Sequence, residues 1–185
     1  MGQAILAWLL LISLTICPTQ STTTFIQKSC SQTLYPQLCN KYLSRFSSRI
    51  KTSPRLLAQT ALAATLSSTR TTSKNLTTYS RTHKMTKREL AAMKDCLEEL
   101  SDSAYELHIS MVEMGKVRSG SEFLYDMNSI ETWVSAALTD DDTCTDGFSG
   151  NNMNGEVKTV VRKQVLNIAH LASIALSFVN NYAKG

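Results

Sequence analysis

The chain has 185 residues, with 19 lysines and arginines against 15 aspartates and glutamates, and its formal net charge at pH 7 is +4. This mild excess is dispersed in short basic groups that alternate with apolar positions or mark helix ends, which indicates solvated faces and argues against a nucleic-acid-binding protein. Three prolines, seven glycines and the lack of alternating apolar and polar segments leave little from which to build a β-sheet, so we expect an all-α fold.

The N-terminus carries an uninterrupted apolar segment, residues 4–16, followed by a run of small hydroxyl residues, 21–24. This length is typical of the core of a secretory signal peptide and is too short to span a bilayer. We therefore expect residues 1–23 to be cleaved, residues 24–185 to form one mature domain, and that domain to be free of the membrane. Because no lysine or arginine precedes the apolar core, the cleavage point stays open between Gln20 and Thr24, and a retained signal anchor is the alternative.

Removal of the leader takes away Cys17 and leaves four cysteines: Cys30, Cys39, Cys96 and Cys144. An even number of cysteines in a secreted chain indicates two disulfides. On one straight helix Cys30 and Cys39 would lie about 13 Å apart, which is too far for a disulfide. The chain must therefore fold back at Tyr35 and Pro36, and we predict a small helical hairpin joined by this cysteine pair.

Two long helical segments follow the hairpin, each with a recognisable start. Ser53 is predicted to cap a helix that opens on Pro54 and runs to about Tyr79. The sequence from Thr86 to Glu89 has the pattern of a capping box, and apolar residues then recur at steps of three and four from Leu90 until Gly115.

Two further helices complete the chain. Ser121 or its neighbour is expected to cap the third, which leads into the acidic stretch 139–146, where we expect a weakened, kinked helix and a solvated acidic turn around Asp140–Asp142. The loop-like residues 149–155 precede the last helix, which starts at Glu156. Four amphipathic helices joined by short loops predict an antiparallel up-and-down four-helix bundle, in which a Cys96–Cys144 disulfide would tie adjacent helices together.

The residues needed for catalysis or metal binding do not come together in the sequence. The histidines at 83, 108 and 170 have no second ligand at metal-binding spacing; we expect His83 in an exposed turn and the other two partly buried on helices. The chain lacks a glycine-rich phosphate loop and a nucleophile elbow, the cysteine spacing is unlike that of a zinc site, and Asp140–Asp142 lacks the alternation of a calcium loop. We expect no metal, no cofactor and no enzymatic activity, and instead a scaffold that binds another macromolecule.

Three stretches that occur in a consistent order carry a family resemblance: residues 29–39, residues 93–96 and residues 132–144. They resemble the plant inhibitors of invertase and pectin methylesterase, and the match in order and spacing extends over essentially all of the mature chain. The resemblance implies a four-helix bundle preceded by a helical hairpin, with the first cysteine bonded to the second and the third to the fourth.

The resemblance also implies one of two target enzymes. Family members that block acid invertase carry Pro-Lys-Phe near the start of the helix that leads to the fourth cysteine, whereas this chain reads Ser121, Glu122 and Phe123. An anion in place of the cation would be repelled by the acidic residues of a glycosidase site. We therefore expect pectin methylesterase as the partner, with acid invertase as the alternative.

By resemblance to inhibitors of this kind, the contact residues include Glu98, Asp102 and Thr143, and Tyr105 extends the same face as a possible aromatic anchor. Acidic side chains suit a cleft built for polygalacturonate, where they imitate the substrate carboxylates. The alternative is that Glu98 and Asp102 are ordinary solvated helix residues.

Asn75 stands in a glycan acceptor sequon, Asn-Leu-Thr. We expect a monomeric protein secreted to the apoplast and cell wall, where it inhibits pectin methylesterase by occluding the pectin-binding cleft in a stoichiometric complex. A detached pro-region of such an enzyme and a small-molecule carrier are further hypotheses, and the second requires a pocket.

Overall fold

A computed structural model of the protein describes residues 18–150, 153 and 155–185, and every regular element in them is a helix. The expected signal-peptide core lies outside these residues. Within the described ranges, none of the helices combines the length and apolar character needed to cross a bilayer.

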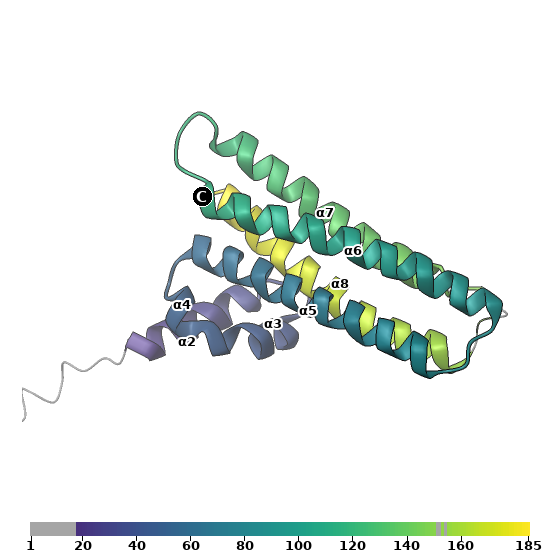
Figure 1. Ribbon diagram of the computed structural model, residues 1–185. Coiled ribbons are helices and arrows are strands. Elements are labelled where there is room, and N and C mark those ends of the chain that lie inside the picture. The colour runs from purple at the N-terminus through teal and green to yellow at the C-terminus, as the bar shows by residue number, and fades with distance from the viewer. Residues whose placement is uncertain (1–17, 151–152, 154) are drawn as a thin grey trace, which may run out of the picture.

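The helices form two groups (Figure 1). The first group is a short N-terminal one: α2 (Pro18–Cys30), α3 (Pro36–Leu43), the 3₁₀ turn η2 (Ser44–Phe46) and α4 (Ser47–Ile50). The second group contains the four long helices: α5 (Pro54–Thr82), α6 (Lys87–Lys116), α7 (Phe123–Asp146) and α8 (Glu156–Ala183).

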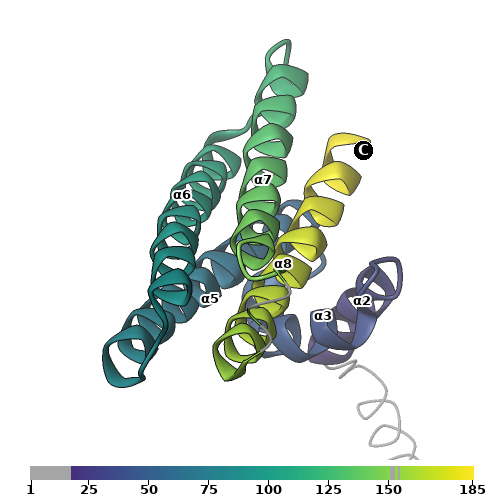
Figure 2. The same cartoon turned by 90° about the vertical axis from the view of Figure 1, so that its right-hand side faces the viewer.

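The four long helices are arranged as an antiparallel bundle. Helix α5 packs against α6 and α8, and α7 packs against the same two helices, so α5 and α7 stand at opposite corners. Each helix follows its predecessor through a short connection and runs in the opposite direction (Figures 1 and 2). The predicted up-and-down four-helix bundle, preceded by a disulfide-stapled hairpin, is confirmed.

The N-terminal hairpin reverses where the sequence predicts, because Pro36 opens α3 directly after Tyr35. Cys30 and Cys39 are disulfide-bonded, with their Cα atoms 5.5 Å apart. The hairpin is fixed to α8 by Tyr35, whose ring stacks on that of His170 at a centroid distance of 3.8 Å, and by Tyr42, whose hydroxyl accepts a hydrogen bond from Asn167. The side of the bundle on which α8 lies is therefore partly covered, and the α6–α7 side is left open (Figure 2).

The predicted starts of α5 and α6 are confirmed in atomic detail. The Ser53 hydroxyl accepts a hydrogen bond from the backbone N–H of Leu56 at 3.3 Å. At the start of α6, the Thr86 hydroxyl accepts from the backbone N–H of Glu89, and the Glu89 carboxylate accepts from the backbone N–H of Thr86 at 2.8 Å. Helix α5 ends at Thr82, slightly beyond the predicted end, and His83 follows it in an exposed position, as expected.

Three expectations about α6 and α7 are wrong. The apolar stripe is expected to begin at Leu90, but Leu90 is 54% exposed, because Met93, Cys96 and Leu100 face the core and Leu90 lies beside that buried stripe. Helix α7 starts at Phe123 without a side-chain cap, since the preceding Glu122 makes no such hydrogen bond. The same helix continues through the acidic stretch to Asp146, so that stretch is helical rather than a turn.

Candidate functional site

The predicted contact residues lie on the outward side of α6 and α7. Glu98, Asp102 and Tyr105 follow one another at steps of four and three on α6, which places them on one face of that helix. All three are exposed, and Tyr105 is 64% exposed although it is a large aromatic residue. Thr143 is exposed on α7, beside the buried Cys144.

Two links, one disulfide and one hydrogen bond, join α6 and α7 beneath this face. The Cys96–Cys144 disulfide joins the helices with their Cα atoms 4.1 Å apart. Further along, the hydroxyl of buried Ser103 donates a hydrogen bond of 3.0 Å to the carboxylate of buried Asp141. Because both links lie between the two helices, the outward side chains of α6 and α7 form one continuous surface, which we call the α6–α7 face.

The α6–α7 face is strongly acidic. Helices α6 and α7 contain 13 aspartates and glutamates but only four lysines and arginines. One of these cations, Lys94, lies 3.6 Å from Glu98, yet the side chain of Glu98 remains 67% exposed and is accessible to a partner. A surface of this composition produces a negative potential over the whole helix pair.

A row of partly buried carboxyls between α6 and α7, formed by Glu99, Glu106 and Asp140, was not recognised in the sequence. Burial raises the pKa of Glu106 to about 7, and the neighbouring carboxyls of Asp140 and Asp102 add to the shift. Burial also raises the pKa of Asp140, as do Glu99 and Asp102, although Glu106 partly opposes the change. The available signal was the spacing of Glu99, Asp102 and Glu106, which places three acids on adjoining faces of one helix.

Asp141 is fully buried, which contradicts the expected solvated acidic turn. It occupies the inward position of α7, four residues after Ala137 and seven after Val134, both of which are also buried. One carboxyl oxygen accepts the hydrogen bond from Ser103, and the other has no hydrogen-bond partner. Burial raises the pKa of Asp141 to about 8, while the Ser103 hydroxyl acts in the opposite direction.

The histidines are spread over the molecule. His170 stacks on Tyr35 and His83 stacks on Tyr79 at a centroid distance of 3.9 Å. His108 is exposed rather than partly buried, because it points outward from α6 beside Tyr105. Among the described residues, no three histidines, cysteines or acids are arranged to hold a metal ion. What the α6–α7 face offers is therefore charge and exposed side chains on a rigid support.

Comparison with known proteins identifies the family. The sequence model of the plant invertase/pectin methylesterase inhibitors matches residues 24–178. The chain belongs to this family.

Several known proteins are similar to this chain over most of their length. Pectinesterase inhibitor 11 of Arabidopsis thaliana is 40% identical over 163 residues, covering 86% of this chain and 81% of that protein. The 21 kDa protein of Daucus carota is 39% identical over 176 residues, covering 94% and 91%. A crystal structure of a mutant form of an Arabidopsis pectin methylesterase inhibitor has a TM-score of 0.67 at 24% identity, covering 84% of this chain and 95% of the other, and supports the fold.

Residues 121–123 are the stretch that the family resemblance sets against the tripeptide of invertase inhibitors, and Phe123, at the start of α7, faces the hairpin rather than the outward side of the helix pair. Phe123 is half-buried and contacts the ring of Tyr182 edge-on at a centroid distance of 5.7 Å. Together with Phe25 and Phe178 it lines a cavity of about 410 Å³ between the hairpin and the bundle. In this family member the aromatic ring of Phe123 is thus held against the protein itself.

The glycan sequon of this family member lies on α5. Asn75 is exposed, and the Thr77 hydroxyl of the sequon donates a hydrogen bond to the carbonyl of Ser73. Ser73 lines the hollow between α5 and α6, and Asn75 lies about 200° further around the helix. A glycan on Asn75 would therefore project away from α6 and leave the α6–α7 face open.

Proposed function

We propose that this protein is a secreted inhibitor of pectin methylesterase that places its α6–α7 face over the pectin-binding cleft and excludes the polysaccharide. The observation that carries the proposal is the exposed acidic row on α6, in which Glu98 and Asp102 adjoin Tyr105. The relatives named pectinesterase inhibitor support the choice of enzyme.

The charge of this face suits the target. A cleft that binds polygalacturonate accepts a chain of carboxylates, and acidic side chains on a protein surface can occupy the same positions. Glu98 and Asp102 lie one turn apart and therefore present two carboxylates in the same direction. Tyr105, one turn further along, adds a large exposed ring of the kind that commonly anchors protein interfaces.

The rigidity of the face also favours inhibition. Helices α6 and α7 are joined by the Cys96–Cys144 disulfide and by the Ser103–Asp141 hydrogen bond. A surface that is already ordered loses little conformational entropy on binding. We accordingly propose a one-to-one complex of two preformed surfaces, with the inhibitor itself monomeric.

Secretion and maturation belong to the same proposal. Residues 1–23 are proposed to be removed as a signal peptide, and residues 24–185 to function in the apoplast and cell wall. The family pattern begins at residue 24, which supports this boundary.

Inhibition of acid invertase is the second candidate, because the family includes inhibitors of both enzymes. Two observations count against it here. The tripeptide Pro-Lys-Phe of invertase inhibitors is replaced by Ser121-Glu122-Phe123, so only its phenylalanine is kept. The ring of Phe123 packs against the ring of Tyr182 in the same protein.

Titration of the purified mature protein against both enzymes tests the proposal. We expect demethylation of pectin to fall to zero at one equivalent of inhibitor, while sucrose hydrolysis by cell-wall and vacuolar invertases is unaffected. Inhibition of invertase with full esterase activity would replace the proposal by the second candidate. Inhibition of neither enzyme would leave the proposal without support.

A further inference from the structure

The charges of this protein are separated in space, which a net charge of +4 conceals. Residues 18–86, which form the hairpin, α5 and the connection to α6, contain 10 lysines and arginines and no aspartate or glutamate. Residues 156–185, which contain α8, hold four cations and one carboxylate, Glu156. Since α5 and α8 pack side by side, the molecule has a basic half opposite the acidic α6–α7 face. The expectation of dispersed charge is therefore wrong.

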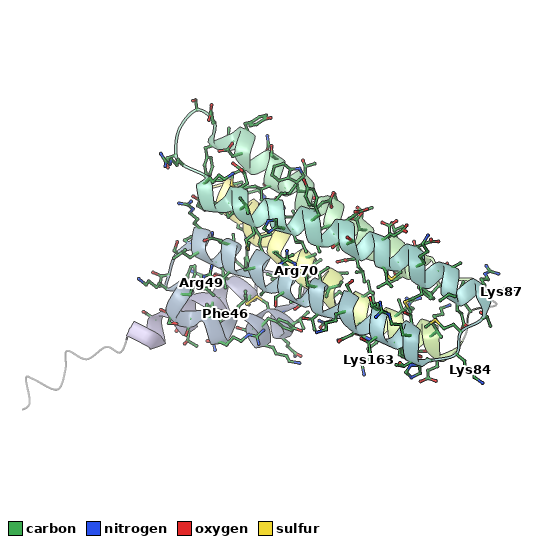
Figure 3. All side chains as sticks on the ribbon, viewed as in Figure 1. Phe46, Arg49, Arg70, Lys84, Lys87 and Lys163 are labelled. Atoms are coloured by element: carbon green, nitrogen blue, oxygen red, sulfur yellow. A yellow bond between two sulfur atoms is a disulfide. The ribbon has the colours of Figure 1, made fainter. Side chains whose placement is uncertain are left out.

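The cations of α5 form a line. Arg70, Lys74 and Arg81 follow one another at steps of four and seven, so all three lie on one side of the helix, and each is exposed. Their Cα atoms span about 17 Å along the helix axis. Lys84 is exposed two residues past the end of α5, and Figure 3 shows Arg70 midway along the helix and Lys84 at its far end. We call these four residues the basic track.

The basic track has no evident structural purpose. Arg55, by contrast, donates hydrogen bonds to the carbonyls of Met114 and Gly115 and so ties α5 to the end of α6. None of the four track cations forms an ion pair with any residue that the structure describes, and the hydroxyls of Thr71 and Thr78 on the same helix are engaged by their own backbone. A row of uncompensated like charges costs stability through mutual repulsion. Its geometry instead fits a linear polymer of negative charge.

We propose that the basic track binds an acidic polysaccharide, of the chemical type of de-esterified polygalacturonate, at the same time as the α6–α7 face holds the enzyme. The choice of this polyanion rests on the proposed function, because polygalacturonate is what pectin methylesterase produces. Each sugar of this polymer carries a carboxylate, so an extended chain can meet several track cations in succession. The inhibitor would be retained where demethylation has already occurred.

Binding of polygalacturonate by the mature protein alone tests the proposal, by affinity electrophoresis or titration calorimetry at low ionic strength. We expect binding that weakens steeply with added NaCl, because the association releases counterions, and we expect no binding to fully methyl-esterified pectin, which is neutral. The variant Lys74→Gln/Arg81→Gln/Lys84→Gln should bind polygalacturonate about tenfold more weakly. Arg70 is left unchanged because it borders Tyr105 in the hollow between α5 and α6.

A matched variant separates the effect of losing the basic track from the effect of lowering the net charge. Lys28→Gln/Arg118→Gln/Lys184→Gln removes the same number of exposed cations elsewhere and should weaken binding only slightly. Equal losses in the two variants would overturn the proposal, as would the absence of polygalacturonate binding at low salt. Tighter binding of duplex DNA than of polygalacturonate at equal charge concentration would overturn the assignment to a polysaccharide.

This experiment contains no esterase, so its outcome is independent of whether the protein inhibits that enzyme. The track variant should retain full inhibition of pectin methylesterase on soluble, highly esterified pectin. Loss of polygalacturonate binding with unchanged inhibition would separate the two surfaces, as the proposal requires. Loss of both activities in this folded variant would contradict it.

Discussion

Asp141 is the residue at which the physical chemistry of this protein is most unusual. It is fully buried, only one of its carboxyl oxygens has a hydrogen-bond partner, and its pKa is raised to about 8 from an ordinary value near 3.8. A carboxyl with a higher pKa in the folded than in the unfolded state binds its proton more tightly when folded. Its contribution to stability is therefore fully present below pH 4 and is lost as the pH rises toward 8.

The variant Asp141→Asn tests this account, because asparagine is neutral at every pH and can still accept the Ser103 hydrogen bond. We expect the free energy of unfolding of the wild-type protein to fall between pH 4 and pH 8, and the fall to be smaller in the variant. At pH 8 the variant should be more stable, by about 1–3 kcal/mol, since no charge is buried. Urea denaturation at a series of pH values measures both quantities. Identical pH profiles for the two proteins would show that Asp141 is ionised at no cost.

Asp102 is the residue at which the proposed inhibition is most directly tested by substitution. Asp102→Lys reverses an exposed charge in the middle of the proposed contact and should raise the inhibition constant for pectin methylesterase by about tenfold or more. Glu122→Lys makes the same charge change at an exposed site before α7 and should alter the constant little. Equal effects of the two variants would mean that long-range charge, rather than contact at α6, is being measured.

At the scale of single residues, local chemistry was predictable from the sequence and burial was not. The Thr86–Glu89 capping box depends on four consecutive residues and could be predicted with its hydrogen bonds. The burial of Asp141 depends on the Ser103 hydroxyl, which lies on another helix, and three consecutive aspartates give no sign of which one points inward. The exposure of Leu90 likewise depends on how α6 is rotated against α5 and α7, with which it packs.

At the scale of the helices, the two disulfides differ in the length of chain that each one closes into a loop. Cys30–Cys39 closes a loop of nine residues, whereas Cys96–Cys144 closes one of 48 residues and joins α6 to α7. The chain-entropy model gives a larger stabilisation for the longer loop. The bond beneath the α6–α7 face should therefore matter more for the stability of the fold.

Removal of each disulfide by paired alanine substitution tests this difference. We expect Cys96→Ala/Cys144→Ala to lower the free energy of unfolding by about 4 kcal/mol and Cys30→Ala/Cys39→Ala to lower it by about 2.5 kcal/mol. Chemical denaturation under identical conditions gives both values. A greater loss from the hairpin pair would mean that docking of the hairpin onto α8, rather than loop closure, determines the effect.

Element boundaries were predictable to the extent that capping signals mark them. Helices α5 and α6 begin where Ser53 and Thr86 provide side-chain caps. Helix α7 has no such cap and starts at Phe123, and it continues through residues 139–146 because Asp141 and Cys144 are secured to α6. Tertiary contacts thus overrode the weak helix propensity of this acidic stretch.

At the scale of the whole molecule, charge is distributed between opposite halves of the bundle. This separation could have been read from the sequence, because the first carboxylate of the chain is Glu89 and 14 of the 15 lie within residues 89–146. The sequence does not show where the two groups of charges lie in space. The fold shows this, because it places α6 against α7 and α5 against α8. In our two proposals, one half binds an enzyme with a cleft for a polyanion and the other half binds the polyanion itself.

The most direct test of the central claim is hydroxyl-radical footprinting of the complex with pectin methylesterase. Tyr105 on α6 and Leu34 in the hairpin turn between α2 and α3 are both accessible, at 64% and 80% exposure, and serve as probe and internal control. If the α6–α7 face covers the cleft, oxidation of Tyr105 falls sharply in the complex, while oxidation of Leu34, which lies outside that face, continues as in the free protein. An inhibited complex in which Tyr105 is oxidised as fast as in the free protein would contradict the proposed docking.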